Sequence, residues 1–124
     1  MNATSNSRRL RHRIEQVLPE LTSSTSAIIF HSRLADVYVE FLVTVHQMVR
    51  ATVPLMRAAL QRCCELQADD PVAATMVPYF EQHIREELHH DDWLLEDLEF
   101  LGVPRANVLR RMPSSAVASL IGGH

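Results

Sequence analysis

A helical pattern longer than any other in this 124-residue chain runs from about Ser32 to Leu66. Apolar residues return there every three or four positions, which is the spacing of one face of an amphipathic helix; Leu42, Val49 and Val53 are examples. No stretch of the sequence shows the apolar–polar alternation of a half-buried strand. The sequence therefore predicts an all-α protein.

Prolines are expected to divide the predicted helices, because proline lacks a backbone donor and its ring clashes with the preceding turn. The first helix is predicted over residues 7–18, ended by Pro19, and a polar linker, "LTSSTSAIIFHS", should follow it. Pro54 should kink or divide the long helical segment. Pro78 should break the next helix and leave residues 79–101 as the strongest helix of the chain.

Other residues indicate where helices begin and end. Asp70 is predicted to cap a helix whose first residue is Pro71, since a carboxylate accepts bonds from the free N–H groups of the first turn. Gly102 is predicted to end the strongest helix, with Pro104 just beyond it. "PRANVLRRM" predicts a short helix, and "SSAVASLIGGH" begins with a serine cap.

Length and composition limit the class of protein. The hydrophobic fraction of 47% and the charged fraction of 22% are typical of globular proteins, and the length predicts a single domain over residues 1–124. A net charge of -3 argues against nucleic acid as a partner, and no apolar run is long enough for a membrane span. No secretory signal is visible, and the adjacent Cys63 and Cys64 are poorly placed to bridge each other. We therefore expect a cytoplasmic protein.

The segment "HIREELHHDDWLLEDLEFLG", residues 83–102, concentrates ionisable groups on a predicted helix. A turn of about 100° per residue places His89 on a uniformly polar side that should face water. The opposite side carries both apolar and ionisable residues, and unpaired ionisable groups cost several kcal/mol to bury. Glu87 and Asp97 therefore need partners there. The residues on this side are His83, Glu87, His90, Leu94 and Asp97.

The residues alone leave two interpretations of this side of the helix open. Imidazole and carboxylate groups at positions i, i+4 and i+7 project to one point, as in the metal sites of helical bundles. Alternatively, the same groups could pair with Arg50 or Arg57 on a neighbouring helix. His46 shares an apolar arc with Leu42 and Val49, so it is either a satisfied core residue or a wall or ligand of the site.

Three segments carry a resemblance to a known family: "HQMVRATVPLM", "YFEQHIREELHHDDWLLEDLEFLGVP" and "MPSSAVASLIG". In order and character they resemble the iron-containing redox enzyme family of the haem-oxygenase-like superfamily, which includes di-iron oxidases. The resemblance covers residues from about 36 to 124. It implies a haem-oxygenase-like helical bundle.

The resemblance also implies a function and a site. The family's metal-ligating acid falls on Glu87 and its histidine on His90, with His83 at the position of a further ligand in some members. His46 and Asp97 are added by the helical pattern as weaker candidates. The implied cofactor is non-haem iron, one or two ions, with another divalent metal as an option. The implied reaction is the oxidation of a small organic substrate by activated dioxygen.

The chain is shorter than a complete bundle of this kind, which needs roughly 200 residues. The expectation is therefore a half-bundle with an incomplete metal site. Three explanations stay open: a truncated or fragmentary product, a half-bundle that self-associates, for example as a two-fold dimer, or a partner chain that supplies the rest. The alternative expectation is a non-catalytic helical association module. The apolar residues expected to serve association are Leu42, Val49, Val53, Leu60, Phe80, Ile84, Leu98 and Phe100.

Overall fold

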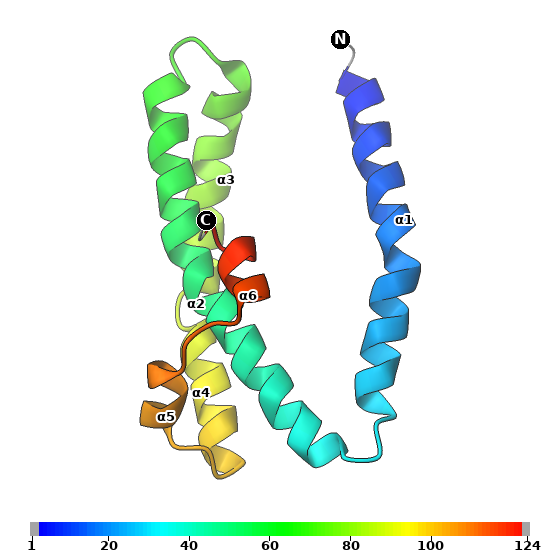
Figure 1. Ribbon diagram of the computed structural model, residues 1–124. Helices are drawn as coiled ribbons and strands as arrows, with labels where there is room; N and C mark the ends of the chain where they lie inside the picture. Colours follow the sequence, from blue (N-terminus) through cyan, green and yellow to red (C-terminus); the bar gives the residue numbers. More distant parts are fainter. Residues whose placement is uncertain (1–2, 123–124) are drawn as a thin grey trace. The chain divides into compact units, whose positions relative to one another are not determined.

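The computed structural model describes residues 3–122, and every regular element in that part of the chain is a helix. Figure 1 shows α2 and α3 side by side, joined by a short turn. None of the helices described combines the length and the apolar composition that a membrane span requires. The predicted all-α class is confirmed. The elements are α1 (Ala3–Ile29), α2 (Leu34–Leu66), α3 (Pro71–Glu87), α4 (His90–Phe100), α5 (Arg105–Arg110) and α6 (Ser115–Leu120).

The chain divides into two compact units, residues 1–38 and residues 39–124. The first unit holds α1 and the first residues of α2, and the second unit holds the rest of α2 together with α3 to α6. Every candidate site residue belongs to the second unit. The single domain over residues 1–124 stays a prediction.

Proline divides none of these helices. Pro19, Pro54 and Pro78 lie inside α1, α2 and α3, so the predicted breaks at Pro19 and Pro78 are wrong, and Pro54 does not divide α2. The predicted linker after Pro19 is helical as far as Ile29, and the Thr25 hydroxyl donates to the Leu21 carbonyl there. All three prolines are exposed, so water can bond the carbonyl that each leaves without a partner.

The predicted helix ends are confirmed where a cap marks them. The Asp70 carboxylate accepts from the N–H groups of Val72 and Ala73, at 2.9 and 3.3 Å. The Ser114 hydroxyl accepts from the N–H of Val117 at 3.3 Å, at the start of α6. Gly102 follows α4 with φ of +86°, in the left-handed region that glycine enters without strain.

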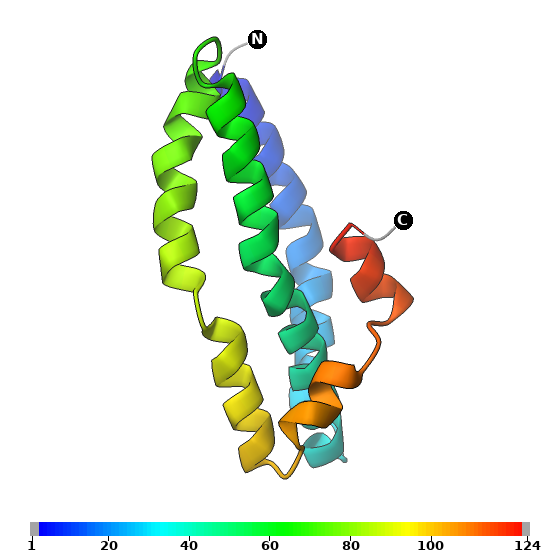
Figure 2. The same cartoon turned by 90° about the vertical axis from the view of Figure 1, so that its left-hand side faces the viewer.

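The predicted continuous helix over residues 79–101 is wrong. Leu88 leaves the helical conformation with ψ of 130°, and His89 follows with φ of 73°, so α3 ends at Glu87 and α4 begins at His90. Figure 2 shows the chain between α3 and α4 as a short loop rather than a continuous helix. His89 is the one residue other than glycine with a positive φ between residues 3 and 122.

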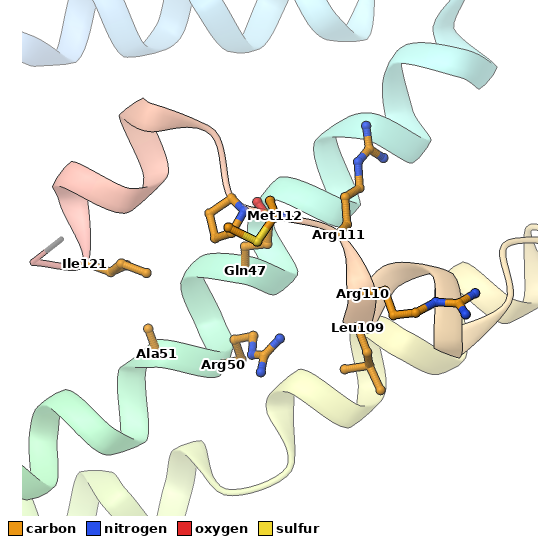
Figure 3. Close-up of a pocket in the computed structure, with 9 residues that line it drawn as sticks. Gln47, Arg50, Ala51, Leu109, Arg110, Arg111, Met112 and Ile121 are labelled. Carbon is orange, nitrogen blue, oxygen red and sulfur yellow. The ribbon is translucent and has the colours of Figure 1, made fainter.

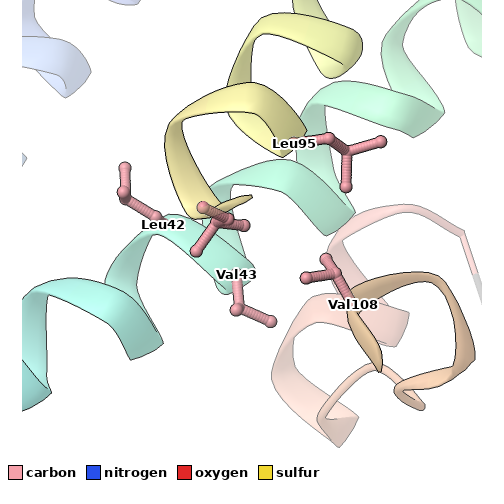
Figure 4. Packing of buried hydrophobic residues seen from close by; sticks show 5 residues of the cluster. Leu42, Val43, Leu95 and Val108 are labelled. Carbon is pink, nitrogen blue, oxygen red and sulfur yellow. The ribbon is translucent and has the colours of Figure 1, made fainter. Parts of the chain in front are cut away.

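The core of the second unit lies where α2, α4 and α5 meet, as Figure 4 shows. Leu42 and Val43 come from α2, Leu95 and Leu98 from α4, and Val108 from α5. Burying an aliphatic side chain of this size stabilises a fold by about 1.5–3 kcal/mol. This cluster therefore packs α4 and α5 against α2. Its members on α4 follow the break between α3 and α4 within a few residues of sequence.

Ion pairs connect the same elements at the surface. Arg111, just beyond α5, donates to both carboxylate oxygens of Glu40 on α2, and its Nη1 is 3.1 Å from Oε1. Arg105 of α5 reaches Asp92 and Glu99 of α4, at 3.3 and 3.4 Å. Exposed pairs contribute about 0–1 kcal/mol each, so they orient the short helices more than they stabilise the fold. Cys63 and Cys64 are both free thiols, and no disulfide joins them.

Candidate functional site

Glu87 and His90 meet across the break between α3 and α4. The Nδ1 atom of His90 lies 2.8 Å from the Oε2 atom of Glu87, and both side chains are about one-third exposed. Glu87 is the last residue of α3 and His90 the first of α4, so the left-handed backbone of His89 lies inside this turn. The structure therefore brings this acid and this histidine together, although two helices carry them rather than one. Their role as metal ligands stays a prediction.

The hydrogen bond to Glu87 orients the His90 ring. When the carboxylate accepts from Nδ1–H, the Nε2 atom is left with a lone pair. Ligating histidines commonly hold this arrangement, with a carboxylate on one ring nitrogen and a metal on the other. The Trp93 ring lies beside His90 with its centroid 4.6 Å away and its plane tilted by 36°, which limits rotation of the imidazole.

His83 has different neighbours. Its Nδ1 atom is 3.4 Å from the Oε2 atom of Glu86, and its ring centroid is 4.3 Å from that of Tyr79. It is one turn before Glu87 on α3, yet no cluster of three ligating groups includes it within the described chain. Its role as a third ligand stays a prediction.

Asp97 is exposed, so its predicted orientation toward the apolar side is wrong. The physical reason is the break at Leu88 and His89, which resets the helical phase. On α4 the buried residues are Leu95 and Leu98, each one position later than the predicted Leu94 and Asp97. One position on a helix corresponds to about 100° of rotation, which is enough to turn Asp97 into solvent.

The two adjacent histidines have different environments, as predicted. The His89 side chain is 74% exposed and its Nδ1 atom lies 3.2 Å from Asp92, whereas His90 is 32% exposed. The polar side predicted for this segment does face water, except that Asp92 is half-buried and bonded to Arg105.

His46 is buried in the second unit, 1% exposed, as its place in the apolar arc predicts. Neither of its ring nitrogens has a hydrogen-bond partner among the described residues, so it is a core residue but not a satisfied one. Burial, and then the charge of Arg50, lowers the pKa of His46, while Asp91 and Asp92 act in the opposite direction. Its imidazole is therefore neutral at pH 7, with one donor and one acceptor unused.

Residues 3–122 do not by themselves gather a complete set of metal ligands. In the part of the chain that the structure describes, no three His, Cys, Asp or Glu side chains gather where they could hold a metal ion. Non-haem iron sites of the facial type use three protein ligands, and the Glu87–His90 pair offers two. Further donors would have to come from another chain or from a rearrangement of this one.

The sequence reasoning did not identify Arg105 as part of this region. Its guanidinium joins Asp92 to Glu99, and the bond to Glu99 is the main cause of its raised pKa. Asp92 and Glu99 are seven residues apart, so they lie on one side of α4, and this spacing was the available signal. Only the fold shows which arginine meets them.

No protein-family model, curated protein or solved structure matches this chain. The resemblance to the iron-containing redox enzymes therefore depends on the sequence segments alone.

Proposed function

We propose that this chain contributes part of the metal centre of an iron-dependent oxidoreductase that oxidises a small organic substrate with dioxygen. The observation that carries the proposal is the Glu87–His90 contact of 2.8 Å in a half-buried position. Carboxylate and imidazole are the side chains that suit ferrous iron, and bound iron would supply the activation of dioxygen. No other described pair on these helices combines a free imidazole nitrogen with a contact of this kind at comparable burial.

In this proposal Glu87 has two possible positions. It can stay on Nδ1 and orient His90, so that Nε2 alone binds the metal, or it can release Nδ1 and bind the metal itself. In both cases the chain provides fewer ligands than a complete centre. The remaining ligands would come from a second copy or from a partner chain.

Exposed apolar side chains support association with another chain. Phe100 is 91% exposed, which agrees with its expected use in an interface. Leu42, Ile84 and Leu98 were expected to serve the same purpose, but they are buried within their own chain. Other large apolar side chains at the surface of the second unit are Val72, Trp93, Met112 and Leu120. A surface of this composition is typical of helices that bury it against a partner.

A non-catalytic association module is the second candidate function. The specific observation that favours it is the break between Glu87 and His90, together with the exposure of Asp97. In this alternative the Glu87–His90 contact is a polar link between α3 and α4 and holds no metal.

Metal binding by four single variants separates the two functions. We expect Glu87→Ala and His90→Ala to lower the affinity for Zn²⁺ and Fe²⁺ by at least about tenfold, in line with the usual cost of losing a ligand or its orienting partner. Glu86→Ala and His89→Ala are the matched controls, since each changes a neighbouring residue of the same type that is more exposed. They should leave the affinity unchanged.

Calorimetric titration under anaerobic conditions measures these affinities. If the wild type binds no metal and Glu87→Ala changes only the free energy of unfolding, the association module is the correct function. If all four variants behave alike, the assigned orientations of these residues are wrong.

A further inference from the structure

A hollow of about 380 Å³ opens in the second unit between α2, the end of α5 and the end of α6. Figure 3 shows its lining residues, which come from three separate segments of the chain. The first wall is a face of α2 that carries Gln47, Arg50 and Ala51. Residues 109–113 form a second wall, and Ile121 closes a third side. Its volume lies within the range of small-molecule sites, about 300–1,000 Å³.

The charge of the hollow is positive, because arginines line it and no acid does. Arg111 is neutralised by both oxygens of Glu40, and Arg110 donates to the neutral amide of Asn107. Arg50 makes no hydrogen bond or ion pair with any residue that the structure describes. In Figure 3 the guanidinium groups of Arg110 and Arg111 point away from that of Arg50. Arg50 therefore offers an uncompensated charge at the hollow.

The amide of Gln47 lies beside this charge. Gln47 is 7% exposed and lines the hollow, yet its side chain has no hydrogen-bond partner among the described residues. Among the described residues, the buried polar side-chain atoms without a partner are the two ring nitrogens of His46, so the Gln47 amide reaches the water in the hollow and can bond a ligand there. Gln47 and Arg50 are three residues apart on α2, so their donors reach the same side of the helix.

The remaining walls are apolar. Ala51 and Ile121 are partly buried, whereas Leu109 is half exposed and Met112 is 84% exposed. A methionine adapts its shape to what it covers, and its sulfur makes favourable contacts with aromatic rings. The exposed Leu109 and Met112 would be covered by an apolar or aromatic group placed in the hollow.

We propose that this hollow binds a small organic monoanion, a carboxylate attached to an apolar or aromatic body. The carboxylate accepts hydrogen bonds from the Arg50 guanidinium and the Gln47 amide, and the body packs against Leu109, Met112 and Ile121. Neither Glu87 nor His90 lines the hollow. The two proposals can therefore fail independently.

Calorimetry with 4-phenylbutyrate tests this site, and the neutral 4-phenylbutyramide has the same body without the charge. We expect the wild type to bind the acid at least about tenfold more tightly than the amide, since a charge-assisted bond of ordinary strength gives a factor of this size. Arg50→Gln should remove that difference. Arg57→Gln should keep it, because Arg57 is exposed on the same helix as Arg50 is, but lies outside the hollow.

Gln47→Leu should weaken binding of both ligands, because an oxygen of each accepts a hydrogen bond from the Gln47 amide, while the leucine side chain keeps the helix packed. Circular dichroism of each variant shows whether it is folded. If a variant is unfolded, the difference between the affinities of the wild type for the acid and for the amide still tests the proposal. Absence of saturable binding, or equal affinity for acid and amide, overturns the proposal. Displacement of the acid by an equal concentration of inorganic phosphate also overturns it, because it would mean a general anion site.

Discussion

His46 lies inside the second unit, 1% exposed, and its two ring nitrogens lack partners among the described residues. An imidazolium there would carry an unpaired buried charge, which is why burial lowers its pKa. The charge of Arg50 on α2 also lowers this pKa, Asp91 and Asp92 on α4 raise it, and Arg105 on α5 adds the smallest lowering effect. The His46 imidazole is therefore held in its neutral form in the folded protein.

The stability of the protein should fall as the pH falls below 6.5. The pKa of His46 is lower in the folded state than its ordinary value of 6.5, so the unfolded chain binds the proton first. The contribution of His46 is present above 6.5 and is lost as the pH falls toward the folded-state value. His46→Leu should remove this dependence, and at pH 7 it should not destabilise, since it also removes two unsatisfied polar atoms.

Urea unfolding at a series of pH values measures this effect. His12→Leu is the matched control, because His12 is exposed on α1 and should leave the pH dependence as it is in the wild type. A His46→Leu protein with the pH dependence of the wild type would contradict the account of His46.

His89 has the backbone conformation that glycine adopts most easily, with φ of 73°. We expect His89→Gly to stabilise the protein by about 0.5–1 kcal/mol, because the left-handed conformation costs a residue with a β-carbon more than it costs glycine. His89→Val should destabilise it, since a branched side chain tolerates a positive φ least. Thermal unfolding of both variants checks this, and a destabilised His89→Gly protein would mean that His89 is helical in solution.

The sequence could predict the difference between His89 and His90, because adjacent residues on a helix point about 100° apart. It could not predict the break between Glu87 and Asp97, since neither glycine nor proline occurs there. Asp97 was misplaced for that reason. Glu87 and His90 were expected on one side of a continuous helix, and the structure instead brings them into contact across a break.

At the scale of the helices, the caps were predictable and the proline breaks were not. A helix cap depends on hydrogen bonds and dihedral angles within a few residues, so the local sequence determines where the helix begins or ends. This holds for Asp70, Ser114 and Gly102. A proline inside a helix removes one hydrogen bond, and the outcome depends on whether the rest of the helix outweighs that loss. In α1, α2 and α3, which have 27, 33 and 17 residues, the remaining helical hydrogen bonds outweigh the loss of that one.

Pro78→Ala should therefore stabilise the protein by about 2 kcal/mol, which is the difference in helix propensity less the added freedom of the unfolded chain. Pro71→Ala is the matched control on the same helix. Pro71 occupies the first turn, where proline costs nothing, so its replacement should change the free energy of unfolding by less than about 1 kcal/mol. Chemical denaturation of the two variants measures the contrast. Equal effects would show that α3 begins after Pro78 in solution.

At the scale of the whole molecule, the buried core of the second unit is small beside the apolar surface that it leaves exposed. The core cluster has five members, while Phe100, Met112 and Val72 are each at least 70% exposed. The expected haem-oxygenase-like half-bundle remains a proposal, since an all-α class alone is compatible with many folds. Association would bury this surface and could bring further metal ligands to the Glu87–His90 pair.

The central claim is that one chain holds part of a metal site and that association completes it. Metal titration at several protein concentrations, with light scattering on the same samples, tests this claim most directly. We expect weak binding by the dilute monomer that prefers Cu²⁺, Ni²⁺ or Zn²⁺ to Fe²⁺, because an unconstrained site follows the Irving–Williams order. Affinity for Fe²⁺ should rise as dimers form, since metal binding and assembly are then linked. Tight binding of Fe²⁺ by a monomer, unchanged at every protein concentration, would contradict the account.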